Sequence, residues 1–210
     1  MSQVESKVAE KLLSIKAVKV QPKDPFTWAS GWKSPIYCDN RKTLSYPEIR
    51  SLVKEELANI VRAKYSDVDV VAGVATGAIA QGALVAEVLG KPFVYVRSSP
   101  KDHGLENLIE GDLKKGQKVV VIEDLISTGG SSLKAVAALR NAGAEVLGMV
   151  AIFTYGFPVA SQKFEEAGVE LTTLSNYNAV LEHLLATEQI GADEIETLKK
   201  WREAPEVWGV

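Results

Sequence analysis

The chain is poor in the residues that cross-link proteins or bind clustered metals. One of its 210 residues is a cysteine, Cys38, and two are histidines. A single cysteine excludes an intramolecular disulfide and a zinc site built from several cysteines. His183 lies in an apolar stretch with no second ligand at a suitable spacing, so we expect a structural role for it and no protein metal site.

An excess of positive charge is also lacking. The 24 lysines and arginines are outnumbered by 27 acids, which gives a formal net charge of -3 and does not favour nucleic-acid binding. No apolar run is long enough to cross a membrane, and residues 1–6 lack the charged-then-apolar pattern of a signal peptide. We therefore expect one cytoplasmic α/β domain, residues 1–210, without nucleic-acid or membrane partners.

Two familiar phosphate-binding motifs, G-x-x-x-x-G-K-[ST] and G-x-G-x-x-G, are absent, which excludes a Walker A loop and the dinucleotide fingerprint. Residues 119–132 nevertheless have the layout of an anion site. Apolar residues 119–122 predict a strand buried on both faces. Glu123 and Asp124 stand where this strand should end, and a small, hydroxyl-rich turn at residues 127–132 precedes a predicted helix at 133–142.

This segment predicts a site for a ribose phosphate. Backbone N–H groups of a small turn and the N-terminus of the following helix both favour an anion. Carboxylates repel a phosphate, but at a strand end they accept hydrogen bonds from ribose hydroxyls. The alternative is an ordinary strand–turn–helix connection with a solvated Glu123–Asp124 pair, which the coincidence of acids, turn, strand and helix makes less favoured.

The run Glu123-Asp124-Leu-Ile-Ser-Thr-Gly-Gly-Ser131 resembles the phosphoribosyl-pyrophosphate (PRPP) motif of type I phosphoribosyltransferases, and its form is most similar to the orotate phosphoribosyltransferase family. The resemblance implies a type I phosphoribosyltransferase-like α/β fold with a mostly parallel central sheet flanked by helices. An N-terminal hood, approximately residues 1–45, would cover a core of residues 46–210. Alternating strands and helices after Val68 also favour an α/β fold.

Residues 26–41 predict a hairpin about Ser30-Gly31, which could be an ordinary β-appendage. Its run Ser30-Gly31-x-Lys33-Ser34-Pro35-x-Tyr37 also resembles the base-covering hood of the same family. The resemblance implies that orotate binds near four residues: Lys33, Tyr37, Cys38 and Ser127. Ala29 stands where some relatives have a lysine, so no lysine contact to phosphate is assigned there. Tyr155 stands where some relatives have an orotate-binding arginine, so we expect base recognition to depend more on backbone groups.

A second glycine turn, Gly73-Val-Ala-Thr-Gly77, follows the predicted strand at residues 68–73. Small residues here could serve close packing of helix on strand. The resemblance implies instead that backbone N–H groups of Ala75, Thr76 and Gly77 bind pyrophosphate.

Residues 98–116 show no clear periodicity and predict a long mobile loop. Arg97, Lys101 and His103 could be a solvated charge run, but the run Arg-x-x-x-Lys-x-His-Gly also resembles the family's catalytic loop. The resemblance implies a homodimer in which these three cations act in the neighbouring subunit's site. Serines at 98 and 99, where some relatives have lysines, leave Lys101 as the main cation of the loop.

The implied reaction joins orotate to the phosphoribosyl group of PRPP, giving orotidine 5′-monophosphate and pyrophosphate in pyrimidine biosynthesis. Mg²⁺ would be held mainly by substrate and water. Implied catalytic residues are Arg97, Lys101, His103 and Asp124. Implied PRPP-binding residues are these four with Glu123, Leu125, Ile126, Ser127, Thr128, Gly129, Gly130, Ser131, Ala75, Thr76 and Gly77. The alternatives are a phosphoribosyltransferase for another base and a non-catalytic PRPP-binding regulator.

Remaining expectations concern the flanking elements. Helices are predicted at residues 4–13 and 45–63, in an alanine-rich stretch that ends at Gly90, at residues 159–167, and twice toward Trp201, with Ser45-Tyr-Pro-Glu48 as a capping box. Further strands are predicted at residues 17–20, 93–97, 145–153 and 169–174.

Overall fold

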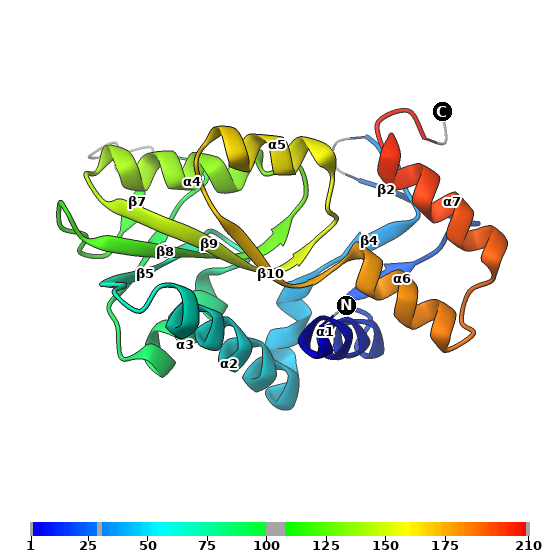
Figure 1. The fold of residues 1–210 in the computed structure, drawn as a ribbon, viewed down its shortest axis with the longest axis horizontal. Coiled ribbons are helices and arrows are strands. Elements are labelled where there is room, and N and C mark those ends of the chain that lie inside the picture. The colour runs from blue at the N-terminus through cyan, green and yellow to red at the C-terminus, as the bar shows by residue number, and fades with distance from the viewer. Residues whose placement is uncertain (1, 29–30, 100–107, 209–210) are drawn as a thin grey trace.

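A six-stranded sheet forms the centre of the computed structural model, which describes residues 2–28, 31–99 and 108–208 (Figure 1). Its strand order is β10 (Leu171–Asn176), β9 (Glu145–Thr154), β8 (Lys118–Ile126), β5 (Val70–Val74), β6 (Phe93–Val96) and β7 (Ile109–Glu110). Neighbouring strands are parallel except at the edge, where β7 runs antiparallel to β6. The predicted α/β fold with a mostly parallel sheet is therefore confirmed.

Helices cover both faces of this sheet. Figure 1 shows α2 (Pro47–Lys64) and α3 (Ile79–Leu89) on one face, and α4 (Gly130–Asn141) and α5 (Pro158–Glu166) on the other. The apolar run in β8 serves both layers, because successive strand residues point to opposite faces. Val120 and Ile122 pack in the cluster that includes α2, whereas Val119 and Val121 pack in the cluster that includes α4.

The N-terminal segment forms the predicted hood beside the sheet. After α1 (Gln3–Ser14), strand β1 (Val18–Val20) pairs antiparallel with β4 (Ile36–Cys38). Strands β2 (Phe26–Thr27) and β3 (Lys33–Ser34) pair as the predicted hairpin. The 3₁₀ helix η1 (Asn40–Ser45) then leads from β4 into α2.

An aromatic cluster joins the hood to the C-terminal part of the chain, where α6 (Tyr177–Ala186) and α7 (Ala192–Glu203) lie (Figure 1). Trp201 of α7 is fully buried, and its ring lies 5.7 Å from that of Trp28 and 5.8 Å from that of Tyr155. Its indole N–H donates to the carbonyl of Lys33 at 3.2 Å. Tyr155 is therefore a packing residue between hood and core.

Several predicted boundaries are wrong, and the reasons are local. Strand β8 continues past Glu123 and Asp124 to Ile126, because Leu125 and Ile126 pair with Phe153 and Thr154 of β9. Helix α4 starts at Gly130, three residues before the predicted start. Strands β5 and β10 both begin two residues later than predicted.

Two further predictions need correction. Ser45 is the last residue of η1 rather than a helix cap, and Tyr46 at the N-cap of α2 makes no side-chain capping bond. The predicted loop over residues 98–116 is interrupted by β7, whose pairing with β6 fixes Ile109 and Glu110. In the parts of the chain that the structure describes, no helix has the length and apolarity to cross a membrane.

Candidate active site

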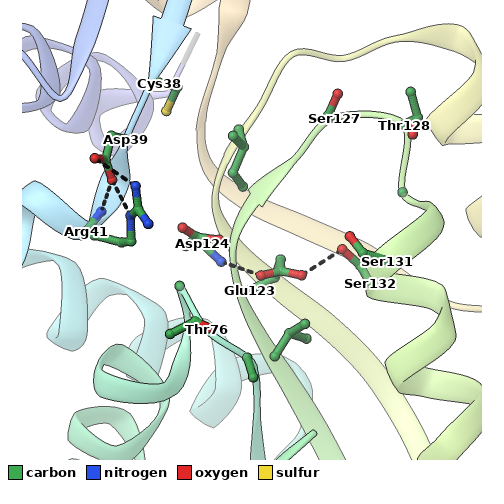
Figure 2. A pocket seen from close by; sticks show the side chains of 15 residues that line it. Cys38, Asp39, Arg41, Thr76, Glu123, Asp124, Ser127, Thr128, Ser131 and Ser132 are labelled. Carbon is green, nitrogen blue, oxygen red and sulfur yellow. Dashed lines mark hydrogen bonds and ion pairs between the residues drawn. The ribbon is translucent and has the colours of Figure 1, made fainter. Parts of the chain in front are cut away.

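A cavity of about 520 Å³ opens at the carboxyl ends of β5 and β8, where ligands of open α/β sheets bind (Figure 2). Backbone and side chains from the hood, the β5–α3 loop and the β8–α4 turn form its wall. The lining residues are Cys38, Asp39, Arg41, Val74, Ala75, Thr76, Gly77, Glu123, Asp124, Leu125, Ser127, Thr128, Gly129, Ser131 and Ser132. The predicted ribose-phosphate segment and glycine turn thus meet in one cavity.

Glu123 lies at the bottom of this cavity and is 4% exposed. The Ser132 hydroxyl donates to its Oε2 at 2.7 Å, and the backbone N–H of Asp124 donates to its Oε1 at 3.0 Å. Burial and the neighbouring Asp124 carboxylate disfavour the charged form, and they raise the pKa of Glu123 from the ordinary 4.5 to about 8.

The Asp124 carboxylate faces the β5–α3 loop. A Cβ added to Gly77 would overlap Asp124 Oδ2, so only glycine allows the loop to approach this side chain so closely. Burial raises the pKa of Asp124, although a hydrogen bond with Glu123 and the charge of Arg41 partly offset it. No described lysine or arginine makes a salt bridge with either acid. A buried and a half-buried carboxyl group side by side can accept hydrogen bonds from a ligand.

The β8–α4 turn has the geometry expected of a phosphate site. Gly129 adopts φ +76°, a left-handed conformation that favours glycine, and it caps the N-terminus of α4. No side chain accepts a hydrogen bond from the first backbone N–H groups of α4. Ser127, Thr128 and Ser131 line the cavity in front of these groups (Figure 2). An anion bound here would satisfy donors that the helix leaves free.

The glycines of the β5–α3 loop differ in their surroundings. Ala75, Thr76 and Gly77 line the cavity, but the backbone N–H of Ala75 donates to the Val96 carbonyl at 2.9 Å and is not free for a ligand. Gly73 instead permits close packing, since a Cβ there would lie 2.8 Å from the carbonyl oxygen of Ala78.

The four predicted base-binding residues are not all in the cavity. Cys38 and Ser127 line it, whereas Lys33 and Tyr37 do not. Strand alternation places Cys38 on the buried face of β4 and Tyr37 on the opposite face, where its ring lies 5.6 Å from that of Phe26. The Lys33 ammonium donates to the Thr27 hydroxyl at 2.9 Å.

Two residues of the predicted PRPP motif also lie outside the cavity. Ile126 is fully buried in the sheet, and Gly130 lines a neighbouring cavity of about 540 Å³ beside α4. Arg97 lines this second cavity, where its Nη1 lies 3.6 Å from Glu110 Oε1. Lys101 and His103 lie outside the described residues.

Sequence reasoning missed Arg41, which lines the cavity together with its neighbour Asp39. The guanidinium donates to Asp39 through Nε at 2.6 Å and through Nη2 at 3.0 Å. Its position directly after the hood strand was the available signal, because β4 ends beside Asp124: the Asn40 side chain donates to the Asp124 carbonyl at 2.5 Å.

Taken together, the sheet, the acid pair and the phosphate turn are those of a type I phosphoribosyltransferase. The model of the family described as "Phosphoribosyl transferase domain" matches residues 42–181. The chain is 66% identical over 203 residues to an orotate phosphoribosyltransferase of Porphyromonas gingivalis, with 97% of each chain covered. It is 55% identical over 206 residues to that of Listeria monocytogenes, covering 98% of this chain and 99% of the relative.

A solved structure agrees with these relatives. The crystal structure of orotate phosphoribosyltransferase from Aeropyrum pernix is 30% identical and superposes with a TM-score of 0.76, covering 88% of this chain and 99% of that one. The chain therefore belongs to the orotate phosphoribosyltransferase family.

The raised pKa of Glu123 predicts a pH-dependent stability. Between the ordinary pKa of 4.5 and the native value of about 8, the folded protein holds a proton that the unfolded chain has lost. The stability from this proton is full below the unfolded pKa and is lost as pH rises through the folded pKa, by up to about 1.4 kcal/mol per pH unit.

Glu123→Gln should remove this slope. We expect the free energy of unfolding of the wild type to fall relative to the variant between about pH 5 and pH 8, measured by urea titration. Glu48→Gln, an exchange at an exposed position of α2, is the control. Parallel pH profiles for wild type and Glu123→Gln would contradict the assignment.

Proposed function

We propose that this chain transfers the 5-phosphoribosyl group from PRPP to orotate, releasing orotidine 5′-monophosphate and pyrophosphate for UMP synthesis. The observation that carries the proposal is the Glu123–Asp124 pair, with Glu123 buried and Asp124 half-buried, in one cavity with an α4 N-terminus that has no side-chain cap. Relatives named orotate phosphoribosyltransferase, 54–66% identical over nearly the whole chain, support the choice of substrate.

PRPP binds with its 5′-phosphate on the turn of residues 127–131. Backbone N–H groups and the hydroxyls of Ser127, Thr128 and Ser131 donate to the phosphate oxygens. Ribose hydroxyls donate to the carboxylates of Asp124 and Glu123. Because burial makes ionised carboxylates costly, hydrogen bonds from the diol stabilise them where water cannot. Thr76 and Gly77 present backbone N–H groups to the pyrophosphate, whereas the N–H of Ala75 already donates to the Val96 carbonyl at 2.9 Å.

Orotate lies between the hood and the phosphate turn, against Cys38 and Ser127. Tyr155 is committed to the aromatic cluster, so backbone groups of the hood and of the turn recognise the orotate carboxylate. Lys33 and Tyr37 join the site only through a movement of the hood, because neither lines the cavity: Lys33 bonds to Thr27, and Tyr37 packs against Phe26.

Catalysis in this proposal depends on position and charge. As the bond from the anomeric carbon to pyrophosphate breaks, positive charge grows on the ribose and negative charge grows on the leaving group. Orotate enters as a carboxylate anion. Its ring nitrogen bonds to the anomeric carbon as the bond to pyrophosphate breaks, and the N–H proton is lost to solvent water, so little acid–base chemistry is needed. Bound Mg²⁺, held by pyrophosphate, ribose hydroxyls and water, would supply charge neutralisation.

The remaining cations come from a second copy of the chain. Arg97 lies in a neighbouring cavity and not in the one that holds Asp124, which fits a role for Arg97, Lys101 and His103 in a partner's site. A lid from a partner would exclude water and bring cations to pyrophosphate as its charge builds. The cytoplasmic location stays a prediction.

An assay of base choice tests the proposed substrate. Initial rates with PRPP and Mg²⁺ should be measured for orotate, uracil, adenine, hypoxanthine, guanine and xanthine. We expect orotate to exceed uracil by roughly a hundredfold or more in kcat/KM, because a site built for a polar group rejects an analogue that lacks it. Comparable rates for uracil and orotate would contradict it, and PRPP binding without turnover of any base would favour a regulator.

Mixing two inactive variants tests the shared site. In a heterodimer of Lys101→Ala and Asp124→Asn, loop action across the interface leaves one site with both defects and one with neither. We expect activity to return to roughly a quarter of the wild-type level when subunits exchange freely, since about half of the dimers are mixed and each has one intact site. Mass spectrometry confirms the heterodimers, and an inactive mixture that contains them would place the loop in its own subunit's cavity.

A further inference from the structure

The proposed substrate brings a large negative charge into a cavity whose described wall has more acidic than basic side chains. PRPP carries a phosphate and a pyrophosphate, while the wall holds three acids: Asp39, Glu123 and Asp124. Among the lining residues that the structure describes, Arg41 is the one cation. A polyanion in this cavity therefore meets a single positive side chain of its own subunit, and the position of that side chain determines which group it can reach.

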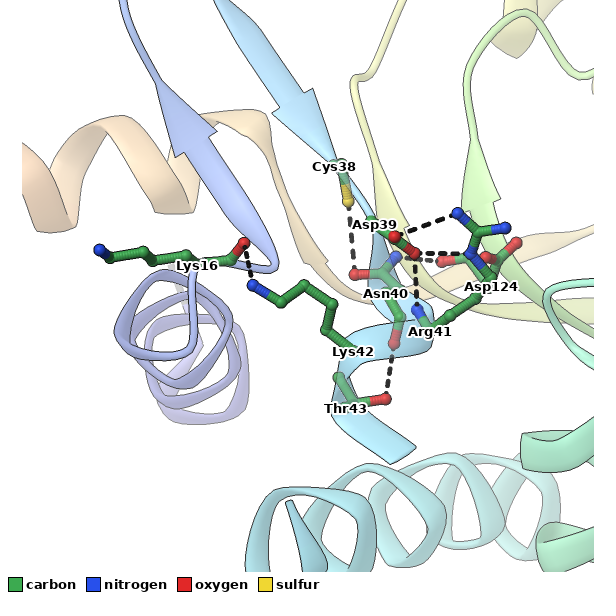
Figure 3. Close-up of polar contacts among 8 residues, drawn as sticks. All are labelled: Lys16, Cys38, Asp39, Asn40, Arg41, Lys42, Thr43 and Asp124. Atoms are coloured by element: carbon green, nitrogen blue, oxygen red, sulfur yellow. Dashed lines mark hydrogen bonds and ion pairs between the residues drawn. The ribbon is translucent and has the colours of Figure 1, made fainter. Parts of the chain in front are cut away.

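Asp39 orients the Arg41 side chain, which remains accessible to a ligand. Asp39 caps η1 by accepting from the backbone N–H of Arg41 at 3.2 Å, and its two carboxylate oxygens also accept from the Arg41 guanidinium (Figure 3). The Arg41 side chain is 59% exposed. Ion pairs this exposed contribute little to stability, so a more highly charged anion can displace Asp39.

The position of Arg41 favours the pyrophosphate end of PRPP. Asn40 ties the start of η1 to the Asp124 backbone, and the charge of Arg41 acts on the Asp124 carboxylate. Gly77 of the β5–α3 loop abuts the same carboxylate. The phosphate turn instead adjoins Glu123 through Ser132. Figure 2 shows Arg41 and Thr76 on one side of Asp124, and Ser127 and Thr128 on the other.

We propose that Arg41 leaves Asp39 and binds the pyrophosphate group of PRPP within its own subunit, an inference that rests on the proposed function. A guanidinium offers a planar fork of donors that matches two phosphate oxygens, and such charge-assisted bonds are stronger than those between neutral groups. Arg41 then supplies positive charge from its own subunit at the leaving group. Asp39 serves to hold the guanidinium at the cavity while the site is empty.

The chain offers a matched control in the next residue. Lys42 also belongs to η1, but it points away from the cavity and its ammonium donates to the Lys16 carbonyl at 3.1 Å (Figure 3). Arg41→Gln and Lys42→Gln thus remove the same charge one residue apart, inside and outside the site.

Calorimetric titration with PRPP and with orotidine 5′-monophosphate, both with Mg²⁺ present, shows which group of the substrate Arg41 binds. PRPP contains pyrophosphate, whereas orotidine 5′-monophosphate contains the 5′-phosphate, the ribose and the base carboxylate without it. For Arg41→Gln we expect the Kd of PRPP to rise roughly tenfold to a hundredfold and that of orotidine 5′-monophosphate to change less than about twofold. Lys42→Gln should match the wild type with both ligands.

Three outcomes would overturn the inference. An unchanged Kd for PRPP would remove Arg41 from the site, and a selective loss of orotidine 5′-monophosphate would move it to the base carboxylate. Equal loss of both ligands would make it a structural residue of the hood. Asp39→Asn keeps a capping side chain but frees the guanidinium, so it should bind PRPP at least as tightly as the wild type, and weakening would contradict the proposal.

The control for the underlying function is the wild type itself. If wild-type protein fails to bind PRPP, the proposed function fails. If the wild type binds PRPP and Arg41→Gln binds it equally well, only the role of Arg41 fails.

Discussion

Two adjacent carboxyl groups at the carboxyl end of a central strand, the buried Glu123 and the half-buried Asp124, constrain the rest of this structure. Neither Glu123 nor Asp124 makes a salt bridge with a described cation, and burial raises the pKa of both. Ser132 and a backbone N–H partly satisfy Glu123, and Gly77 lacks a Cβ because Asp124 occupies that space. A folded protein keeps such a costly pair where a ligand completes its hydrogen bonds.

A series of hydrogen bonds connects the hood to Asp124 of the acid pair. The Cys38 thiol donates to Asn40 Oδ1 at 3.3 Å, while Asn40 Nδ2 donates to the Asp124 carbonyl. The Thr43 hydroxyl donates to the Asn40 carbonyl and accepts from Gln81 of α3 at 3.2 Å. These hydrogen bonds fix the position of Cys38, which is expected to contact the base, relative to Asp124, which is expected to contact the ribose. On the far side, Trp201 and Trp28 hold the hood through the carbonyls of Lys33 and Ile36.

Sequence reasoning succeeded where a local pattern determines the structure. The apolar run before Glu123, the glycine of the phosphate turn and the hairpin of the hood all depend on neighbours in the chain. It failed where pairing with a strand distant in the sequence determines the bounds of an element, as for the extension of β8 and the short strand β7. Tyr37 and Cys38 are neighbours in the hood motif, but successive strand residues point to opposite faces, and only Cys38 lines the cavity. Similarity to a motif alone does not show this difference. Arg41 was missed because its relation to Asp124 spans more than 80 residues of sequence.

The affinity of Asp124→Asn for PRPP tests the central claim most directly. Titration calorimetry with Mg²⁺ should show a Kd at least roughly tenfold above that of the wild type, because an amide replaces one oxygen acceptor of the ribose hydroxyls with a donor. The melting temperature should stay nearly unchanged, since Asp124 makes no salt bridge with a described cation that the exchange would break. Asp67→Asn, at a surface acid paired with Lys118, should bind PRPP as the wild type does. An Asp124→Asn protein that binds PRPP as tightly as the wild type would contradict the account.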